Sequence, residues 1–126
     1  QSWTRIKARL LIWMKRFSTG LISMDKEKVI KRVKQYSDLV RQNFRVKKII
    51  LYGSYAKGSA KKDSDIDVAI VLSSIDEDFL ISESKLFRLR RNIDARIEPI
   101  LLEEKNDKSG FLEEILKTGE IIYSAD

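Results

Sequence analysis

The spacing of apolar and polar residues predicts helices and strands in alternating order along the chain. Between residues 26 and 44, apolar residues recur every three or four positions, which is the spacing of one buried helix face. Asp25 precedes this stretch and is expected to cap a helix beginning near Lys26. A continuous apolar run at 46–52 predicts a strand, and a short helix is expected to follow it through Ala56.

The rest of the chain continues this mixture of elements. A polar loop is expected at 57–64. Further strands are predicted at 66–72, 93–101 and 121–123, and helices at 79–91 and 109–117. The pattern indicates an α/β (α+β) domain with a small mixed β-sheet flanked by helices.

The 126-residue chain contains neither cysteine nor histidine. This excludes disulfides, cysteine–histidine zinc sites and a histidine base supplied by the chain itself. Any catalysis would then use carboxylates, hydroxyls, lysine, arginine or a bound ion, and oxygen ligands favour hard cations such as Mg²⁺ or Mn²⁺. The absence of cysteine is typical of a cytoplasmic protein, which is the location we expect.

Positive charge is concentrated at the N-terminus. Residues 1–23 hold five of the 25 basic residues and none of the 19 acidic ones, although the whole chain has a net charge of +6. Residues 24–126 are therefore close to neutral, and direct nucleic-acid binding is not expected of them.

We interpret residues 1–23 as a basic leader and residues 24–126 as the domain. Met24 resembles a natural start, so the leader is expected to be a vector-derived or upstream-translated extension. The alternative is a basic amphipathic helix that lies on a membrane surface or a partner. Its apolar run, Leu10 to Met14, is too short to span a bilayer, so no membrane span is expected.

The most specific pattern lies between residues 51 and 72. Gly53 and Ser54 end the first strand, and a ten-residue interval separates them from Asp65 and Asp67 at the start of the second. Because strand side chains alternate between faces, the two aspartates are expected to point the same way. Two carboxylates beside a turn that offers backbone N–H groups to phosphate suggest a metal–nucleotide site. The alternative is an ordinary turn with capping aspartates.

The Gly-Ser and Asp-x-Asp pattern resembles the signature of the minimal nucleotidyltransferases, a family within the DNA polymerase β-like superfamily. The resemblance covers residues 24–126 and implies the polymerase β-like nucleotidyltransferase fold. It implies that Gly53, Ser54 and Lys57 bind the nucleoside triphosphate, which is expected to be ATP.

The resemblance also implies a third carboxylate on a later strand. Asp94 is the best match, and with Asp65 and Asp67 it is expected to hold two Mg²⁺ ions. Asp94 would also act as the base for the acceptor hydroxyl. Glu98 is its rival, expected on the same face of the 93–101 strand.

The function implied by the resemblance is transfer of AMP from ATP to a tyrosine hydroxyl of a HEPN-domain ribonuclease toxin, which the modification silences. Such an antitoxin needs a partner or a second copy to complete its acceptor site, so a hetero- or homo-oligomer is expected. One alternative is a small-molecule enzyme resembling the aminoglycoside nucleotidyltransferases. Others are a non-catalytic antitoxin that acts by binding and, with less support, an RNA-directed nucleotide-adding enzyme.

Overall fold

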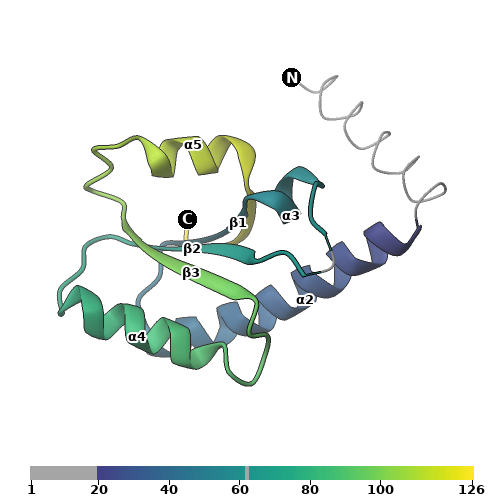
Figure 1. Ribbon diagram of the computed structural model, residues 1–126. Coiled ribbons are helices and arrows are strands. Elements are labelled where there is room, and N and C mark those ends of the chain that lie inside the picture. The colour runs from purple at the N-terminus through teal and green to yellow at the C-terminus, as the bar shows by residue number, and fades with distance from the viewer. Residues whose placement is uncertain (1–19, 62) are drawn as a thin grey trace.

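A four-stranded mixed sheet with helices on both faces forms the protein. The computed structural model describes residues 20–61 and 63–126. Its elements, labelled in Figure 1, are α2 (Gly20–Asn43), β1 (Lys48–Tyr52), α3 (Ser54–Lys57), β2 (Ile66–Leu72), α4 (Phe79–Leu89), β3 (Ile97–Glu103), α5 (Phe111–Thr118) and β4 (Glu120–Ser124). The α/β class predicted from the sequence is confirmed.

The strands lie in the order β3-β2-β1-β4. β1 is antiparallel to both β2 and β4, whereas β2 and β3 are parallel and are connected through α4. The two central strands, β1 and β2, carry the most deeply buried residues because each is paired on both sides. The ends of these two strands therefore provide a rigid support for any site built on them.

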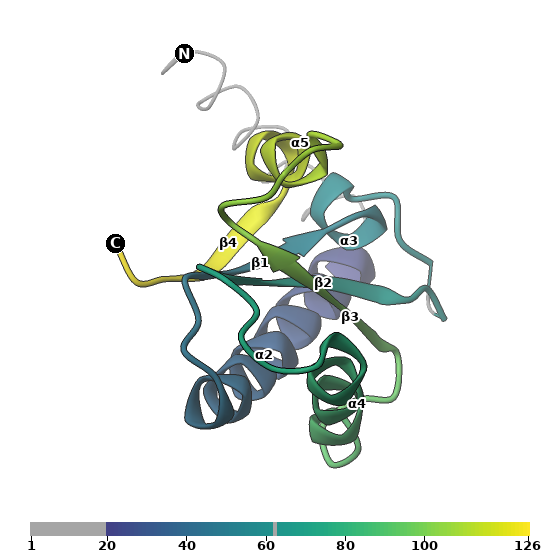
Figure 2. The same ribbon diagram turned by 90° about the vertical axis from the view of Figure 1, so that its left-hand side faces the viewer.

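Helices α2 and α4 cover one face of the sheet (Figures 1 and 2). Apolar residues of α2 recur at the spacing of one helix face and pack with Leu86 of α4 against inward-facing strand residues. The Tyr36 hydroxyl donates to the Leu86 carbonyl oxygen at 2.7 Å and joins the two helices. This cluster forms the main core, which includes Val29, Val33, Tyr36, Val40, Ile49, Leu51, Ile66, Val68, Ile70, Leu86, Ile97 and Leu101.

The opposite face is covered only in part, by α5. Leu112 and Ile115 of this helix pack on Ile50, Ala69 and Val71 in a second, smaller cluster. Toward the end of β1 and the start of β2 and β3, the same face carries half-buried polar residues. The sheet thus has a closed apolar face and a partly open face.

Two predicted boundaries differ most from the structure. Helix α2 begins by Gly20, so Asp25 lies inside the helix and does not occupy the cap position. β3 begins at Ile97 instead of residue 93, because the backbone N–H groups of Ile93 and Asp94 donate to the Arg90 carbonyl oxygen and close a turn after α4.

The predicted leader falls largely outside the described residues, which exclude 1–19. The backbone of residues 20–23 belongs to α2 and continues into the predicted domain without a break. Within the described part of the chain, no helix is both long and apolar enough to cross a membrane.

Candidate functional site

The Gly-Ser turn at the end of β1 depends on a backbone conformation that favours glycine. Gly53 has φ +76° and ψ −147° and is the N-terminal flanking residue of α3. It has no side chain to cap the helix, so the first N–H groups of α3 receive no side-chain cap from it. Ser54 begins this helix, and Lys57 ends it with an exposed side chain.

Asp67 lies directly against this turn. A Cβ atom added to Gly53 would overlap Oδ2 of Asp67, so only glycine lets the carboxylate approach the turn this closely. The close approach brings together the two halves of the sequence pattern, Gly53-Ser54 and the aspartates. Asp65 precedes β2 with an exposed side chain, and its charge acts on Asp67.

A row of polar side chains crosses three strands at this point. In the sheet register, Asp67 pairs with Tyr52 of β1 on one side and with Glu98 of β3 on the other. Paired residues on neighbouring strands project from the same face, so these three side chains share the partly open face with α5. The Tyr52 ring also packs edge-on against Phe111 of α5, with ring centroids 5.7 Å apart.

The electrostatics of this row disfavour negative charge. Burial raises the pKa of Asp67 above its usual value, and the charges of Asp65 and Glu98 raise it further. The same conditions raise the pKa of Tyr52 to about 12, first through burial and then through Asp67 and Glu98. Tyr52 therefore remains a neutral phenol near pH 7.

Asp65 and Asp67 form no ion pair with lysine or arginine among residues 20–61 and 63–126. Two adjacent carboxylates without a basic partner fit a divalent cation, which would remove their mutual repulsion. The described residues contain no group of three acidic side chains arranged to hold an ion, so the fit rests on the aspartate pair.

The sequence predicts that Asp94 and Glu98 lie on one strand, but the structure places only Glu98 on β3. Asp94 occupies the turn before β3, where its side chain is 5% exposed and is held by two guanidinium groups. Arg32 Nη1 lies 2.6 Å from its Oδ2, and Arg96 Nη2 lies 2.8 Å from the same oxygen. Hydrogen bonds from Arg96, together with the one from Arg32, hold the pKa of Asp94 well below its usual range despite its burial.

Glu98, the rival in the sequence analysis, is the acidic residue that lies beside Asp67. Its side chain is 44% exposed, and Oε1 lies 3.6 Å from Nη1 of Arg90. The sequence alone predicts that Glu98 lies on a strand, since it follows Ile97 in the largely apolar segment 97–102. Which residue stands opposite Asp67, however, is set by the pairing of β2 with β3.

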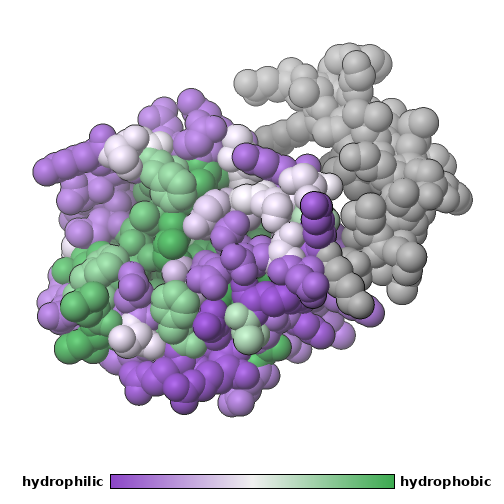
Figure 3. All heavy atoms as spheres, in the orientation of Figure 1, coloured by the Kyte–Doolittle hydropathy of each residue, from purple (hydrophilic) through white to green (hydrophobic). Residues whose placement is uncertain are grey.

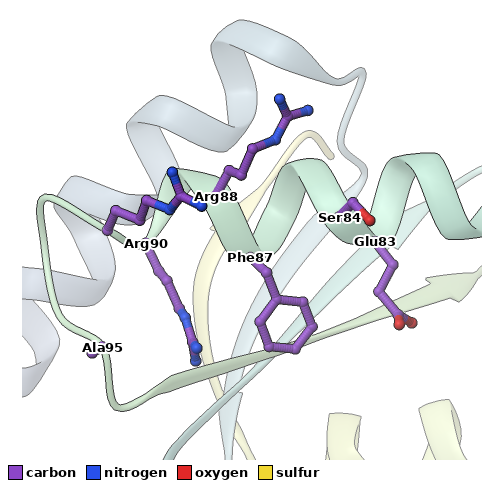
Figure 4. Close-up of a pocket in the computed structure, with 7 residues that line it drawn as sticks. Glu83, Ser84, Phe87, Arg88, Arg90 and Ala95 are labelled. Atoms are coloured by element: carbon purple, nitrogen blue, oxygen red, sulfur yellow. The ribbon is translucent and has the colours of Figure 1, made fainter.

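Arginines at and just after the end of α4 line a depression of about 570 Å³, whose lining includes neither Asp65 nor Asp67 (Figure 4). Arg88, Arg90 and Arg91 contribute to its lining together with Phe87. Arg90 lies over the Phe87 ring at 4.8 Å and also donates to the Ile97 carbonyl oxygen at 2.7 Å. Arg90 thus connects the depression to the strand that carries Glu98.

The sequence of this chain is similar to those of known nucleotidyltransferases. The family model described as polymerase beta, nucleotidyltransferase matches residues 34–126. A protein of Methanocaldococcus jannaschii with an inferred assignment as a protein adenylyltransferase is 34% identical over 97 residues, which are 74% of this chain and 96% of that protein. A protein adenylyltransferase of Thermococcus cleftensis is 31% identical over 88 residues, covering 67% of this chain and 80% of its own length.

Solved structures share the fold. A structure assigned as a nucleotidyltransferase from Sulfolobus solfataricus superposes with a TM-score of 0.63 at 21% identity, covering 82% of this chain and 87% of that one. A toxin–antitoxin structure with AMP-PNP gives a TM-score of 0.55 at 21% identity over 80% of this chain and 74% of that one. Because the family model matches residues 34–126, the chain belongs to the polymerase beta nucleotidyltransferase family.

Proposed function

We propose that this protein is a Mg²⁺-dependent adenylyltransferase that moves AMP from ATP to a tyrosine hydroxyl of a HEPN-domain toxin. The observation that carries the proposal is the Asp65–Asp67 pair: Asp67 lies against the Gly53 turn, and neither carboxylate has a lysine or arginine partner in the described part of the chain. The names of the two archaeal relatives support protein as the acceptor. The fold is shared with a chain of a toxin–antitoxin structure, which is consistent with a toxin partner.

Each residue of the proposed site would have a distinct role in binding the metal ion and the triphosphate. Asp65 and Asp67 would hold Mg²⁺, whose positive charge offsets the negative charge of the triphosphate. Backbone N–H groups after Gly53 and the Ser54 hydroxyl would bind β- and γ-phosphate oxygens, since Gly53 lets them approach closely. Lys57, exposed at the end of α3, would add a positive charge to the triphosphate site.

In the proposed reaction, the tyrosine oxygen forms a bond to the α-phosphorus and the bond to the β-phosphate bridging oxygen breaks. Pyrophosphate leaves, and the hydroxyl proton must be accepted by a base. We assign this role to Glu98 instead of Asp94, because Glu98 lies beside Asp67 and is partly exposed. Both Asp94 oxygens are already occupied by guanidinium groups or a backbone N–H.

A partner protein would cover apolar side chains that the described residues expose. Large apolar side chains are exposed where α4 begins, with Phe79 at 45%, Leu80 at 70% and Ile81 at 53% exposure. Figure 3 shows hydrophobic residues gathered over the start of α4 and up toward α5. Exposed apolar surface of this kind is consistent with a protein partner.

The test is a labelling reaction with Mg²⁺, purified protein and the HEPN-domain protein encoded beside it. Label from α-phosphate-labelled ATP should appear on the partner, and label from γ-labelled ATP should not. Mass spectrometry should place the added AMP on a tyrosine. The Asp65→Asn/Asp67→Asn double variant should abolish labelling, whereas Asp76→Asn, which changes an exposed aspartate in the turn after β2, should not.

Transfer of the γ-label would identify a kinase and contradict the proposal. Full neutralisation of the toxin by the double variant would favour an antitoxin that acts by binding. Absence of α-label on the partner, with label on small acceptors such as amino sugars, would assign a different acceptor class.

A further inference from the structure

The two halves of the proposed site come from separate segments, and one cluster of polar side chains links them. The Gly53-Ser54 turn follows β1, while Asp65 and Asp67 lie at the start of β2. Tyr55 and Arg96 connect these segments, and Asp94 holds Arg96 in place.

Asp94 holds Arg96 in one position through several contacts. Oδ1 of Asp94 accepts hydrogen bonds from the Arg96 backbone N–H at 2.9 Å and from its Nε at 3.1 Å. Oδ2 accepts from Arg96 Nη2 at 2.8 Å and from Arg32 Nη1 at 2.6 Å. A guanidinium bound at two nitrogens by one carboxylate is fixed in orientation as well as in distance.

Arg96 in turn contacts both halves of the site. Its backbone carbonyl oxygen accepts from the N–H of Ile66, the residue between the two aspartates, at 2.8 Å. Its Nη1 donates to the hydroxyl of Tyr55 at 3.0 Å. Tyr55 directly follows Ser54 in α3 and is 4% exposed.

The Tyr55 hydroxyl extends the connection to the loop before Asp65. It donates to the Lys61 carbonyl oxygen at 3.3 Å, and the same oxygen accepts from the N–H of Ser64 at 3.0 Å. The Lys61 N–H donates to the Ser64 hydroxyl oxygen at 2.7 Å, which closes the turn. One buried hydroxyl thus joins Arg96 to the turn that leads into the aspartate pair.

We propose that Asp94, Arg96 and Tyr55 form a brace that sets the position of the Gly-Ser turn relative to Asp65 and Asp67. In this brace Asp94 is a positioning residue, which acts through Arg96 and Tyr55 and does not contact the nucleotide. The inference rests on the proposed function of the site. It predicts that weakening the brace impairs ATP binding more than it impairs the chemical step, because the phosphate-binding turn loses its fixed position.

The test compares Tyr55→Phe with Tyr36→Phe. Both substitutions remove one buried hydroxyl that donates to a backbone carbonyl oxygen, but Tyr36 joins α2 to α4 and lies outside the brace. Tyr55→Phe should raise the KM for ATP about three- to tenfold with a smaller change in kcat, in line with the net contribution of about one hydrogen bond. Tyr36→Phe should leave both constants near the wild-type values.

Amide exchange followed by NMR gives a second reading that does not require transfer activity. In Tyr55→Phe, the Lys61 and Ser64 amides should exchange faster than in the wild type, whereas in Tyr36→Phe they should not. Asp94→Asn should accelerate exchange at the same two amides, because it weakens the hold on Arg96.

Equal behaviour of the two tyrosine variants, in both KM and amide exchange, would overturn the brace. So would an Asp94→Asn protein in which Lys61 and Ser64 exchange as in the wild type. If the wild type transfers no AMP, the proposed function fails, but faster exchange in Tyr55→Phe would still support the brace. The two failures can therefore be distinguished.

Discussion

Two aspartates that the sequence assigns to one predicted metal site, Asp67 and Asp94, have opposite electrostatic surroundings. Asp67 faces Asp65 and Glu98, and its pKa is raised by burial and by these two charges. Asp94 is clasped by Arg96 and Arg32, and its pKa is lowered. The first group holds unbalanced negative charge, and the second is already neutralised by the protein.

This difference in electrostatic surroundings indicates that Asp67 belongs to a binding site, whereas Asp94 has a structural role. A carboxylate that remains ionised near like charges destabilises the fold and is retained where a cation or substrate compensates it. A carboxylate paired with two guanidinium groups has its compensation built in, and its removal leaves positive charge without a partner. We therefore expect substitution of Asp67 to affect chemistry and substitution of Asp94 to affect stability and positioning.

The largest expected effect is on transfer by Asp67→Asn. Loss of one of the two carboxylates proposed to hold Mg²⁺ should reduce AMP transfer by about 10²- to 10³-fold, the scale seen when preorganised charge stabilisation is removed. Its free energy of unfolding should equal or exceed that of the wild type, because repulsion from Asp65 and Glu98 is relieved. Urea unfolding and labelled-ATP assays would check both, and a strongly destabilised Asp67→Asn protein would contradict the comparison.

Asp94→Asn should show the reverse pattern in stability. We expect its free energy of unfolding to fall by about 3 kcal/mol, the lower end of the range for breaking a buried ion pair, because Arg32 is 46% exposed. Urea unfolding measures this loss. A change below about 0.5 kcal/mol, typical of a surface substitution, would mean that the ion pairs of Asp94 with Arg32 and Arg96 do not stabilise the fold.

Gly53→Ala should have an intermediate effect on both properties. The residue would have to adopt φ +76° and would push against the Asp67 carboxylate. Strain of this kind costs about 1 to 3 kcal/mol, and displacement of Asp67 should also lower AMP transfer. Gly58→Ala provides a control for φ, since Gly58 has φ +77° but open space around it. Equal loss of transfer in the two variants would show that the contact with Asp67 is unimportant.

The smallest expected effect is a difference in acid sensitivity. The pKa of Asp94 is lower in the folded protein than its value of 3.8 in a free chain, so its stabilising contribution is present above pH 4 and is lost as pH falls further. Wild-type stability should therefore fall more steeply below pH 4 than that of Asp94→Asn, by up to about 1.4 kcal/mol per pH unit. Parallel curves for the two proteins would contradict the lowered pKa.

The amino-acid pattern predicted the central strands well because their apolar runs are buried on both sides of the sheet. The predicted bounds of β2, 66–72, match those of the structure. The sequence predicts that Gly53 and Asp67 share a site. In the structure they are in contact, because Gly53 has a positive φ and no side chain to displace the Asp67 carboxylate. Local sequence contains this information because the turn and the strand each have a strong signature.

The third carboxylate could not be placed in the same way. Alternation of residues from 93 onward predicted that Asp94 would lie on a strand, but hydrogen bonds to the Arg90 carbonyl oxygen form a turn there instead. The pairing of Glu98 with Asp67 and the contact of Arg32 with Asp94 join residues 31 and 62 positions apart. Such pairings depend on how the elements pack, which no local pattern specifies.

The most direct test of the difference between the two acidic groups is urea unfolding with and without Mn²⁺ for the wild type, Asp67→Asn and Asp94→Asn. A cation that binds only the folded protein raises its free energy of unfolding, by about 2.7 kcal/mol at a hundred times the dissociation constant. We expect this increase in the wild type and in Asp94→Asn, and little of it in Asp67→Asn. An increase that is retained in Asp67→Asn and lost in Asp94→Asn would contradict the assignment of the two carboxylates.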